Sequence, residues 1–210
     1  MPTFCWTSVT VGAIMFFVGQ AAQRIRMTED EYLAFERASD ERHEYADGEI
    51  FAMAGGSEAH SAVAAGMIRV LGNVFHGRRC RVYTSDMRIH IPIARRYVYS
   101  DASVVCGLRE FQGDKRDILL NPRAIVEVLS PATEEYDRGD KFTQYKTIPS
   151  LAHYVLASQD KPFVEVFTRQ LDGTWTCVNY EAGQRIVLPT LECEFDVDQV
   201  YTDVFDDIAV

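Results

Sequence analysis

Two carboxylates lie inside apolar, strand-like segments of the sequence, where an acidic side chain needs a specific partner. Asp101 lies within residues 97–106, and Glu127 lies within residues 124–130. An ionised carboxylate buried without a partner is costly, so such groups are usually paired, hydrogen-bonded or bound to a metal. On neighbouring strands the two would form an oxygen-rich site suited to Mg²⁺ or Mn²⁺. The alternative is that each lies at a strand end and faces solvent or an arginine.

The elements that must position these carboxylates are predicted from hydrophobic periodicity and turn signals. Thr28 and Glu31 form a capping box at the start of a helix, and Asp47-Gly48 is a strong hairpin turn signal. Helices are expected at about 28–38, 57–76 and 134–147, with a short helical tail. Strands are expected at 80–84, 86–92, 97–106, 123–130, 152–158, 162–169, 174–181 and 185–188, besides a hairpin over 42–53. Helices before and after a run of strands indicate an α/β fold, with a central mixed β-sheet flanked by α-helices.

The overall composition is that of one globular domain. The chain has 210 residues, of which 47% are hydrophobic and 25% charged. Its formal net charge of −10 argues against broad, non-specific adhesion to nucleic acid. Basic residues do cluster within residues 76–81 and at Arg95-Arg96, which either form a local basic groove or belong to surface loops.

The five cysteines are widely spaced and show no CxxC pair and no zinc-ligand spacing. This usage predicts a reduced, cytoplasmic protein with incidental cysteines.

The first 26 residues are interpreted as an N-terminal extension, and residues 27–210 as a single domain. Residues 3–22 carry no charge and are rich in apolar side chains, but no basic residue precedes them. We therefore favour an upstream extension or a misassigned start, with Met27 as the true start, over a membrane anchor.

An ordered set of motifs resembles the Uma family of restriction-endonuclease-like proteins, within the PD-(D/E)XK nuclease superfamily. The resemblance extends over about residues 27–205. The matching segments are residues 45–50 (YADGEI), 55–60 (GGSEAH), 99–106 (YSDASVVC), 125–131 (IVEVLSP), 140–145 (DKFTQY) and 150–156 (SLAHYVL).

The sequence departs from the superfamily pattern at two positions. The proline that usually precedes the Asp is Ser100, and the lysine usually found two residues after the Glu is Leu129. The resemblance suggests that the cation has moved to the following helix, where Lys141 is the candidate and Lys146 the second choice. A solvated Lys141 paired with Asp137 at i, i+4 is the structural alternative.

The resemblance implies a Mg²⁺- or Mn²⁺-dependent endonuclease with DNA as its substrate. Asp101 and Glu127 would hold the metal, because hydrolysis of a phosphodiester needs a cation that neutralises developing charge and activates water. Glu44 would supply an outer ligand or hold a metal-bound water, unless it is only a hairpin-edge carboxylate. Lys141 would orient water or stabilise the transition state.

Two further functions compete with a DNA endonuclease. The net charge and Leu129 favour a non-catalytic nuclease-fold module that binds or scaffolds, and a hydrolase of small phosphoesters would keep the chemistry without nucleic acid. His60 is interpreted as structural. A homodimer is expected for an enzyme that cuts both strands, with the hairpin of strands 163–169 and 174–181 as an interface or simply as part of the sheet.

Overall fold

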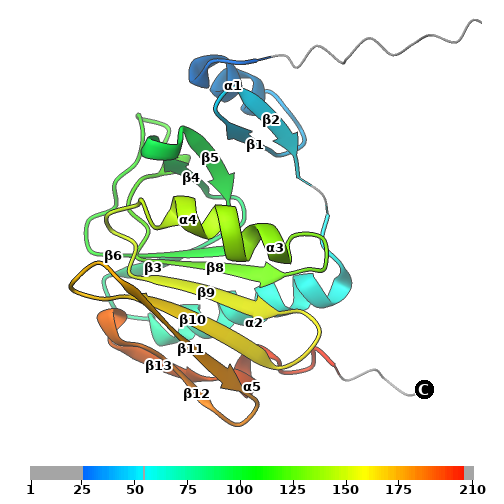
Figure 1. The fold of residues 1–210 in the computed structure, drawn as a ribbon, viewed down its shortest axis with the longest axis vertical. Helices are drawn as coiled ribbons and strands as arrows, with labels where there is room; N and C mark the ends of the chain where they lie inside the picture. The colour runs from blue at the N-terminus through cyan, green and yellow to red at the C-terminus, as the bar shows by residue number, and fades with distance from the viewer. Residues whose placement is uncertain (1–25, 54, 206–210) are drawn as a thin grey trace, which may run out of the picture.

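A six-stranded sheet lies at the centre of the computed structural model, which describes residues 26–53 and 55–205. Its strand order is β11-β10-β9-β8-β6-β3, and of its neighbouring pairs only β8 and β9 are parallel. The strands are β3 (Cys80–Thr84), β6 (Ala102–Cys106), β8 (Ala124–Leu129), β9 (His153–Ser158), β10 (Phe163–Arg169) and β11 (Trp175–Glu181). Figure 1 shows this sheet between helices on both faces.

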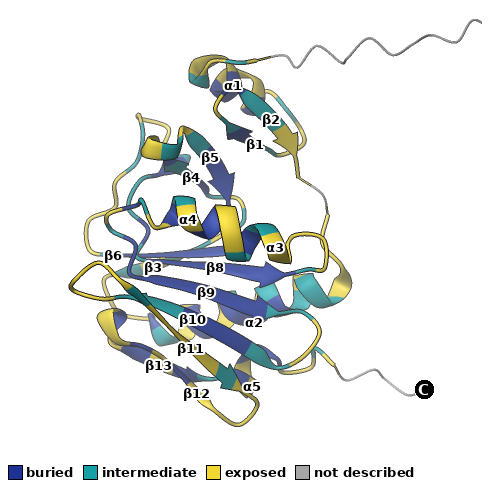
Figure 2. Cartoon of the chain, viewed as in Figure 1, coloured by how far each residue is buried: buried dark blue, intermediate teal, exposed yellow. Residues whose placement is uncertain are grey.

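Alternation along β8 divides its side chains between two hydrophobic clusters, because successive residues of a strand point to opposite faces. Val126 and Val128 pack on one face, and Ile125 and Leu129 on the other. All six residues of β8 are buried, and Figure 2 shows β8 and β9 as the most continuously buried strands of the sheet. Glu127 shares the face of Ile125 and Leu129, so its carboxylate lies where the pattern places an apolar side chain.

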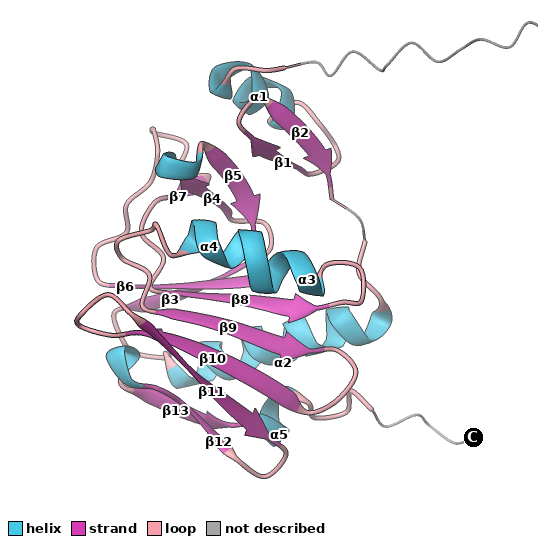
Figure 3. Ribbon diagram, viewed as in Figure 1, coloured by secondary structure: helices cyan, strands magenta, loops and turns pink. Residues whose placement is uncertain are grey.

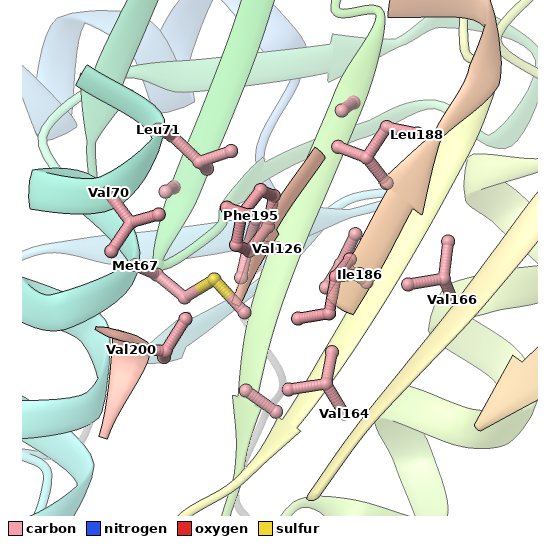
Figure 4. Packing of buried hydrophobic residues seen from close by; sticks show 14 of the residues in the cluster. Met67, Val70, Leu71, Val126, Val164, Val166, Ile186, Leu188, Phe195 and Val200 are labelled. Carbon is pink, nitrogen blue, oxygen red and sulfur yellow. The ribbon is translucent and has the colours of Figure 1, made fainter. Parts of the chain in front are cut away.

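The first face is covered by α2 (Glu58–Val74), α5 (Val197–Val200) and a hairpin of β12 (Arg185–Leu188) and β13 (Cys193–Asp196). Figure 4 shows this core, in which Met67, Val70, Leu71, Val126, Val164, Val166, Ile186, Leu188, Phe195 and Val200 are labelled. A Cβ atom added at Gly66 would lie 2.0 Å from the Val200 carbonyl oxygen. Glycine at this position therefore lets α2 and α5 approach closely.

The opposite face is covered by one helical segment that changes its winding in the middle. It comprises α3 (Glu134–Tyr136), the π-helical turn η2 (Asp137–Lys141) and α4 (Phe142–Tyr145), as seen above β8 in Figure 3. The segment agrees with the helix predicted for residues 134–147. A π-helical turn inside a helix is rare and is frequently found at functional sites.

A second, five-stranded sheet extends from this face, with the order β2-β1-β5-β4-β7. Its strands are β1 (His43–Ala46), β2 (Glu49–Ala52), β4 (Arg88–Ile91), β5 (Arg96–Tyr99) and β7 (Ile118–Leu119). The short helix α1 (Glu29–Glu36) packs on it through Tyr32, which stacks on Tyr45 with ring centroids 5.0 Å apart. Two 3₁₀ turns, η1 (Pro92–Ala94) and η3 (Pro189–Leu191), complete the described elements.

The predicted capping box and the predicted hairpin turn are both confirmed. Thr28 and Glu31 form the capping box of α1, and β1 and β2 pair around Asp47-Gly48. Both turn residues have positive φ, 43° at Asp47 and 99° at Gly48, as a two-residue type I′ turn requires.

The single strand predicted for residues 97–106 is wrong. The chain forms β5 in the five-stranded sheet and then β6 in the six-stranded sheet, and Ser100-Asp101 is the crossing between them. The apolar run continues across this crossing because both strands are buried, so periodicity alone does not reveal the break. The short strands β7 and β13 were also not predicted.

The interpretation of all five cysteines as incidental is corrected by the structure. Cys80 on β3 and Cys106 on β6 are directly opposite each other and form a disulfide, with their Cα atoms 4.0 Å apart. Their separation of 26 residues gave no spacing signal, because the pairing depends on the register of two strands.

The predicted N-terminal extension, residues 1–26, lies almost entirely outside the described residues. Within the part of the chain that the structure describes, no helix is long and apolar enough to cross a membrane.

Candidate active site

Glu127 lies at the centre of the polar cluster between β8 and the helical segment above it. Only 4% of the residue is exposed. Its Oε1 atom lies 2.8 Å from Lys141 Nζ and accepts a hydrogen bond of 2.8 Å from the Tyr145 hydroxyl. The Glu inside strand β8 is therefore a buried, partnered carboxylate rather than a strand-end residue facing solvent.

Asp101 is brought to Glu127 by the register of β6 and β8. Ala102 is aligned with Val126, and continuing this antiparallel register by one position aligns Asp101 with Glu127. The Val128 backbone N–H donates to Asp101 Oδ2 at 2.7 Å, and this hydrogen bond fixes the Asp101 side chain beside β8. Asp101 thus lies one residue before β6, aligned with Glu127 on β8, rather than within a strand as predicted.

Lys141 reaches Glu127 from the π-helical turn. Its Nζ atom lies 3.4 Å from Asp137 Oδ1 as well as 2.8 Å from Glu127 Oε1, and its side chain is 8% exposed. The predicted pairing with Asp137 exists, but Lys141 is buried instead of solvated. Asp137, only 3% exposed, is a further site residue that the sequence analysis considered only as a helix-surface partner.

Glu44 approaches the same cluster from β1. Its Oε1 accepts a hydrogen bond of 3.2 Å from the Tyr99 backbone N–H, close to the crossing into β6. The side chain is half-buried and is not a free hairpin-edge carboxylate.

His60, interpreted from the sequence as structural, also lines this cluster. It lies in the first turn of α2, where its backbone N–H donates to the N-cap residue Ser57. Its Nε2 atom lies 3.5 Å from Asp101 Oδ2. The available signal was the position of the histidine in the first turn after Gly55-Gly56, but its proximity to Asp101 depends on tertiary packing.

These side chains line one cavity of about 600 Å³. The charged and imidazole groups in its wall are Glu44, His60, Asp101, Glu127, Asp137 and Lys141. Apolar side chains, Phe51 and Met53 among them, form other parts of the wall. Four residues far apart in the sequence and named as candidates, Glu44, Asp101, Glu127 and Lys141, therefore meet in one place.

Other sequence candidates lie elsewhere. The Lys146 Nζ atom lies 4.2 Å from the centre of the Phe142 ring, and this residue is exposed and outside the cavity wall. His43, His76, His90 and His153 do not line the cavity either.

The cavity holds an excess of negative charge. Burial, together with the carboxylates of Asp137 and Asp101, raises the pKa of Glu127 from 4.5 to about 8 against the opposing effect of Lys141. Burial likewise raises the pKa of Asp101, although the Val128 N–H and His60 oppose it. Burial alone would lower the pKa of Lys141, but Glu127, Glu44 and Asp137 together raise it, so the lysine is cationic.

The donor set fits a hard divalent cation held by few protein ligands. No group of three or more His, Cys, Asp and Glu side chains with metal-binding geometry occurs within residues 26–53 and 55–205. Mg²⁺ is commonly bound by one or two carboxylates and keeps several of its waters. Asp101 and Glu127 line the same cavity and are the two carboxylates that would hold such an ion, while Lys141 and Tyr145 both contact Oε1 of Glu127.

Comparisons with known proteins agree with this architecture. The sequence model described as “Uma2: Putative restriction endonuclease” matches residues 29–199. The chain is 36% identical over 176 residues to “Uncharacterized protein slr1290” of Synechocystis, covering 84% of this chain and 92% of the relative. It is 33% identical over 149 residues to “Uncharacterized protein sll1609” of the same organism, covering 71% and 84%.

A solved structure shares the fold. The crystal structure of “a putative nuclease belonging to DUF820 from Anabaena variabilis” superposes with a TM-score of 0.67 at 20% identity. The alignment covers 85% of this chain and 99% of that chain. The predicted α/β fold, a central mixed sheet flanked by helices in a restriction-endonuclease-like core, is confirmed.

Proposed function

Because the chain belongs to the Uma2 family, we propose that it is a divalent-metal-dependent endonuclease that hydrolyses phosphodiester bonds of DNA. The observation that carries the proposal is the contact of Lys141 with Glu127 in the cavity that Asp101 also lines. These are the residue types that phosphodiester hydrolysis requires, and they converge although Leu129 occupies the usual lysine position.

Asp101 and Glu127 would hold Mg²⁺ or Mn²⁺, with Glu44 as an outer ligand acting through water. The bound ion would neutralise charge on the phosphate and lower the pKa of the attacking water. Val128 fixes Asp101 through its backbone N–H, and His60 lies against the same carboxylate. Both contacts would orient Asp101 before substrate binds, which is how a preorganised site avoids reorganisation during the reaction.

Lys141 would stabilise the negative charge that develops on the scissile phosphate. Its ammonium group contacts Glu127 at 2.8 Å and Asp137 at 3.4 Å. Burial strengthens its interaction with an anion, because the surroundings have a lower dielectric constant than water. In the PD-(D/E)XK superfamily this positive charge usually comes from a lysine on the strand, two residues after the glutamate. Here Lys141 would supply it from η2 instead.

A non-catalytic nuclease-fold module is the second candidate. It is favoured by Leu129 and by the ion pair that already satisfies Lys141 without substrate. A module without catalysis does not need divalent metal, so metal dependence distinguishes the two functions. The endonuclease proposal includes three further points: the substrate is DNA, the protein forms a homodimer, and it acts in the cytoplasm.

The test is cleavage of supercoiled plasmid by the purified protein with Mg²⁺ or Mn²⁺, and with EDTA. We expect nicked or linear product only with metal, and none from Asp101→Asn, which keeps the shape of the side chain and removes its charge. Lys141→Met should slow cleavage by about a hundredfold (~2.7 kcal/mol), as expected for one lost transition-state contact.

Lys146→Met is the matched control, because Lys146 is an exposed lysine near the same helical segment that does not line the cavity. It should cut at the wild-type rate. Cleavage that continues unchanged in EDTA or in Asp101→Asn would refute the proposed function.

A further inference from the structure

A second cavity, of about 900 Å³, lies at the C-terminal end of α2. Its wall is formed by the end of α2, the start of β3 and the loop after β6. The ionisable side chains in the wall are all basic: His76, Arg78, Arg79, Arg81 and Arg109. No aspartate or glutamate among the described residues lines it, although the chain has 31 acidic and 21 basic residues.

Three of these arginines have no acidic partner. Within residues 26–53 and 55–205, the exposed side chains of Arg79, Arg81 and Arg109 form no ion pair or hydrogen bond. Arg185, by contrast, is paired with Glu194 and Asp196. Several unpaired guanidinium groups around one cavity repel each other, and an anion in that cavity would relieve the repulsion.

Hydrogen bonds and a disulfide hold the wall of the basic cavity in place. Arg78 donates to the backbone carbonyls of Leu191 and Glu192 at 2.8 and 3.1 Å, which anchors the turn after α2. The disulfide between Cys80 and Cys106 joins the strand that carries Arg81 to the strand that precedes Arg109. The fold therefore holds these arginines near one another.

The two cavities lie at opposite ends of α2. Ser57 and His60, at the start of the helix, line the candidate active site, and Phe75, at its end, lines the basic cavity. The 17 residues of α2 span about 25 Å at 1.5 Å per residue. Figure 1 shows the helix running behind the sheet, with its cyan start near the arrowhead of β8. At 3.4 Å per base pair, this length corresponds to roughly seven base pairs of DNA.

We propose that the basic cavity binds the phosphate backbone of duplex DNA at a distance from the active site. Arginine is suited to this ligand because its planar guanidinium can bind phosphate oxygens bidentately. The contact would offset the repulsion between DNA and a chain of net charge −10. The choice of DNA as the phosphate ligand rests on the proposed function, whereas the anion site rests on its own residues.

The experiment is binding of a fluorescent duplex, long enough to span both cavities, by anisotropy in EDTA over a series of salt concentrations. The variant Arg79→Gln/Arg81→Gln removes two exposed guanidinium groups. We expect the slope of log K against log [salt] to decrease in magnitude by about 2, because each lost phosphate contact removes ~0.9.

The control is Arg37→Gln/Arg185→Gln, which loses the same charge at exposed arginines that are paired with carboxylates elsewhere. It should keep the wild-type slope. Equal slopes in the two double variants, or no salt-dependent binding by the wild type, would overturn the inference. EDTA prevents cleavage, so the binding measurement is independent of activity. If the wild type binds DNA with the expected salt dependence but never cuts it with metal, only the proposed function is refuted. If the wild type cuts DNA with metal but the two double variants have equal slopes, only the inference is refuted.

Discussion

Among the single residues of the site, Glu127 lies where acidic side chains outnumber the one lysine. Lys141 supplies one positive charge to the carboxylates of Glu127, Asp137 and Glu44, but burial and the neighbouring carboxylates still raise the pKa of Glu127. The raised pKa of Glu127 means that this carboxyl group takes up a proton more readily than an exposed glutamate does. The residue types were predictable from sequence for Asp101 and Glu127, because a carboxylate in an apolar run is conspicuous. The proximity of His60 and Asp137 was not, since it depends on how α2 and η2 pack against β8.

His153 gives a prediction for the pH dependence of stability. It is fully buried between the hydroxyls of Thr168 and Thr190, at 3.1 and 2.6 Å. Burial and the charge of Arg123 lower its pKa from 6.5 to about 4. Between these pH values the unfolded chain binds a proton that the folded protein excludes. This contribution to stability is therefore present above pH 6.5 and is lost as the pH falls to about 4.

The expected loss of unfolding free energy from this one group is about 2–3 kcal/mol. His153→Gln lacks the titrating ring, so its free energy of unfolding should fall less between the two pH values. Urea unfolding of both proteins at each pH measures the difference. Parallel losses in the two proteins would mean that His153 does not contribute.

At the scale of secondary-structure elements, the site depends on two features that interrupt regular structure. The crossing at Ser100-Asp101 moves the chain from one sheet to the other, and the π-helical turn η2 carries both Asp137 and Lys141. The sequence predicted the helix and the flanking strands because their periodicity is local. It did not predict the interruptions, because a buried strand on each side of Asp101 produces one continuous apolar run.

The contact of α2 with α5 can be tested by adding one methyl group. Gly66→Ala should destabilise the protein by about 1–3 kcal/mol, because the new Cβ would overlap the Val200 carbonyl oxygen and force the helices apart. Gly72→Ala is the matched control in the same helix, since no atom lies within 4 Å of its added Cβ. It should stabilise the helix by about 0.5–1 kcal/mol. Thermal unfolding of both variants measures the contrast, and an equal effect of the two substitutions would contradict the packing.

At the scale of the whole molecule, β11 is the exposed edge of the central sheet. The hairpin of β10 and β11 completes that sheet, as one of the two alternatives predicted. The edge strand remains available for a second copy of the chain, because an unpaired edge can accept another strand. Val178, 50% exposed, lies in its middle.

A homodimer through β11 remains a prediction. Light scattering at micromolar concentration should give twice the chain mass for the wild type, because two antiparallel β11 edges can pair about a two-fold axis. Val178→Lys should shift the protein toward the monomer by placing two like charges near that axis. A monomeric mass for the wild type would exclude this interface.

Calorimetric titration with Mn²⁺ tests most directly whether Asp101 and Glu127 form a metal site. We expect a saturable heat of binding for the wild type and its loss in Asp101→Asn and in Glu127→Gln, because each substitution removes one of two charged ligands. Lys146→Met should bind Mn²⁺ as the wild type does. Unchanged Mn²⁺ affinity in both carboxylate variants would contradict the proposed metal site and the endonuclease function that depends on it.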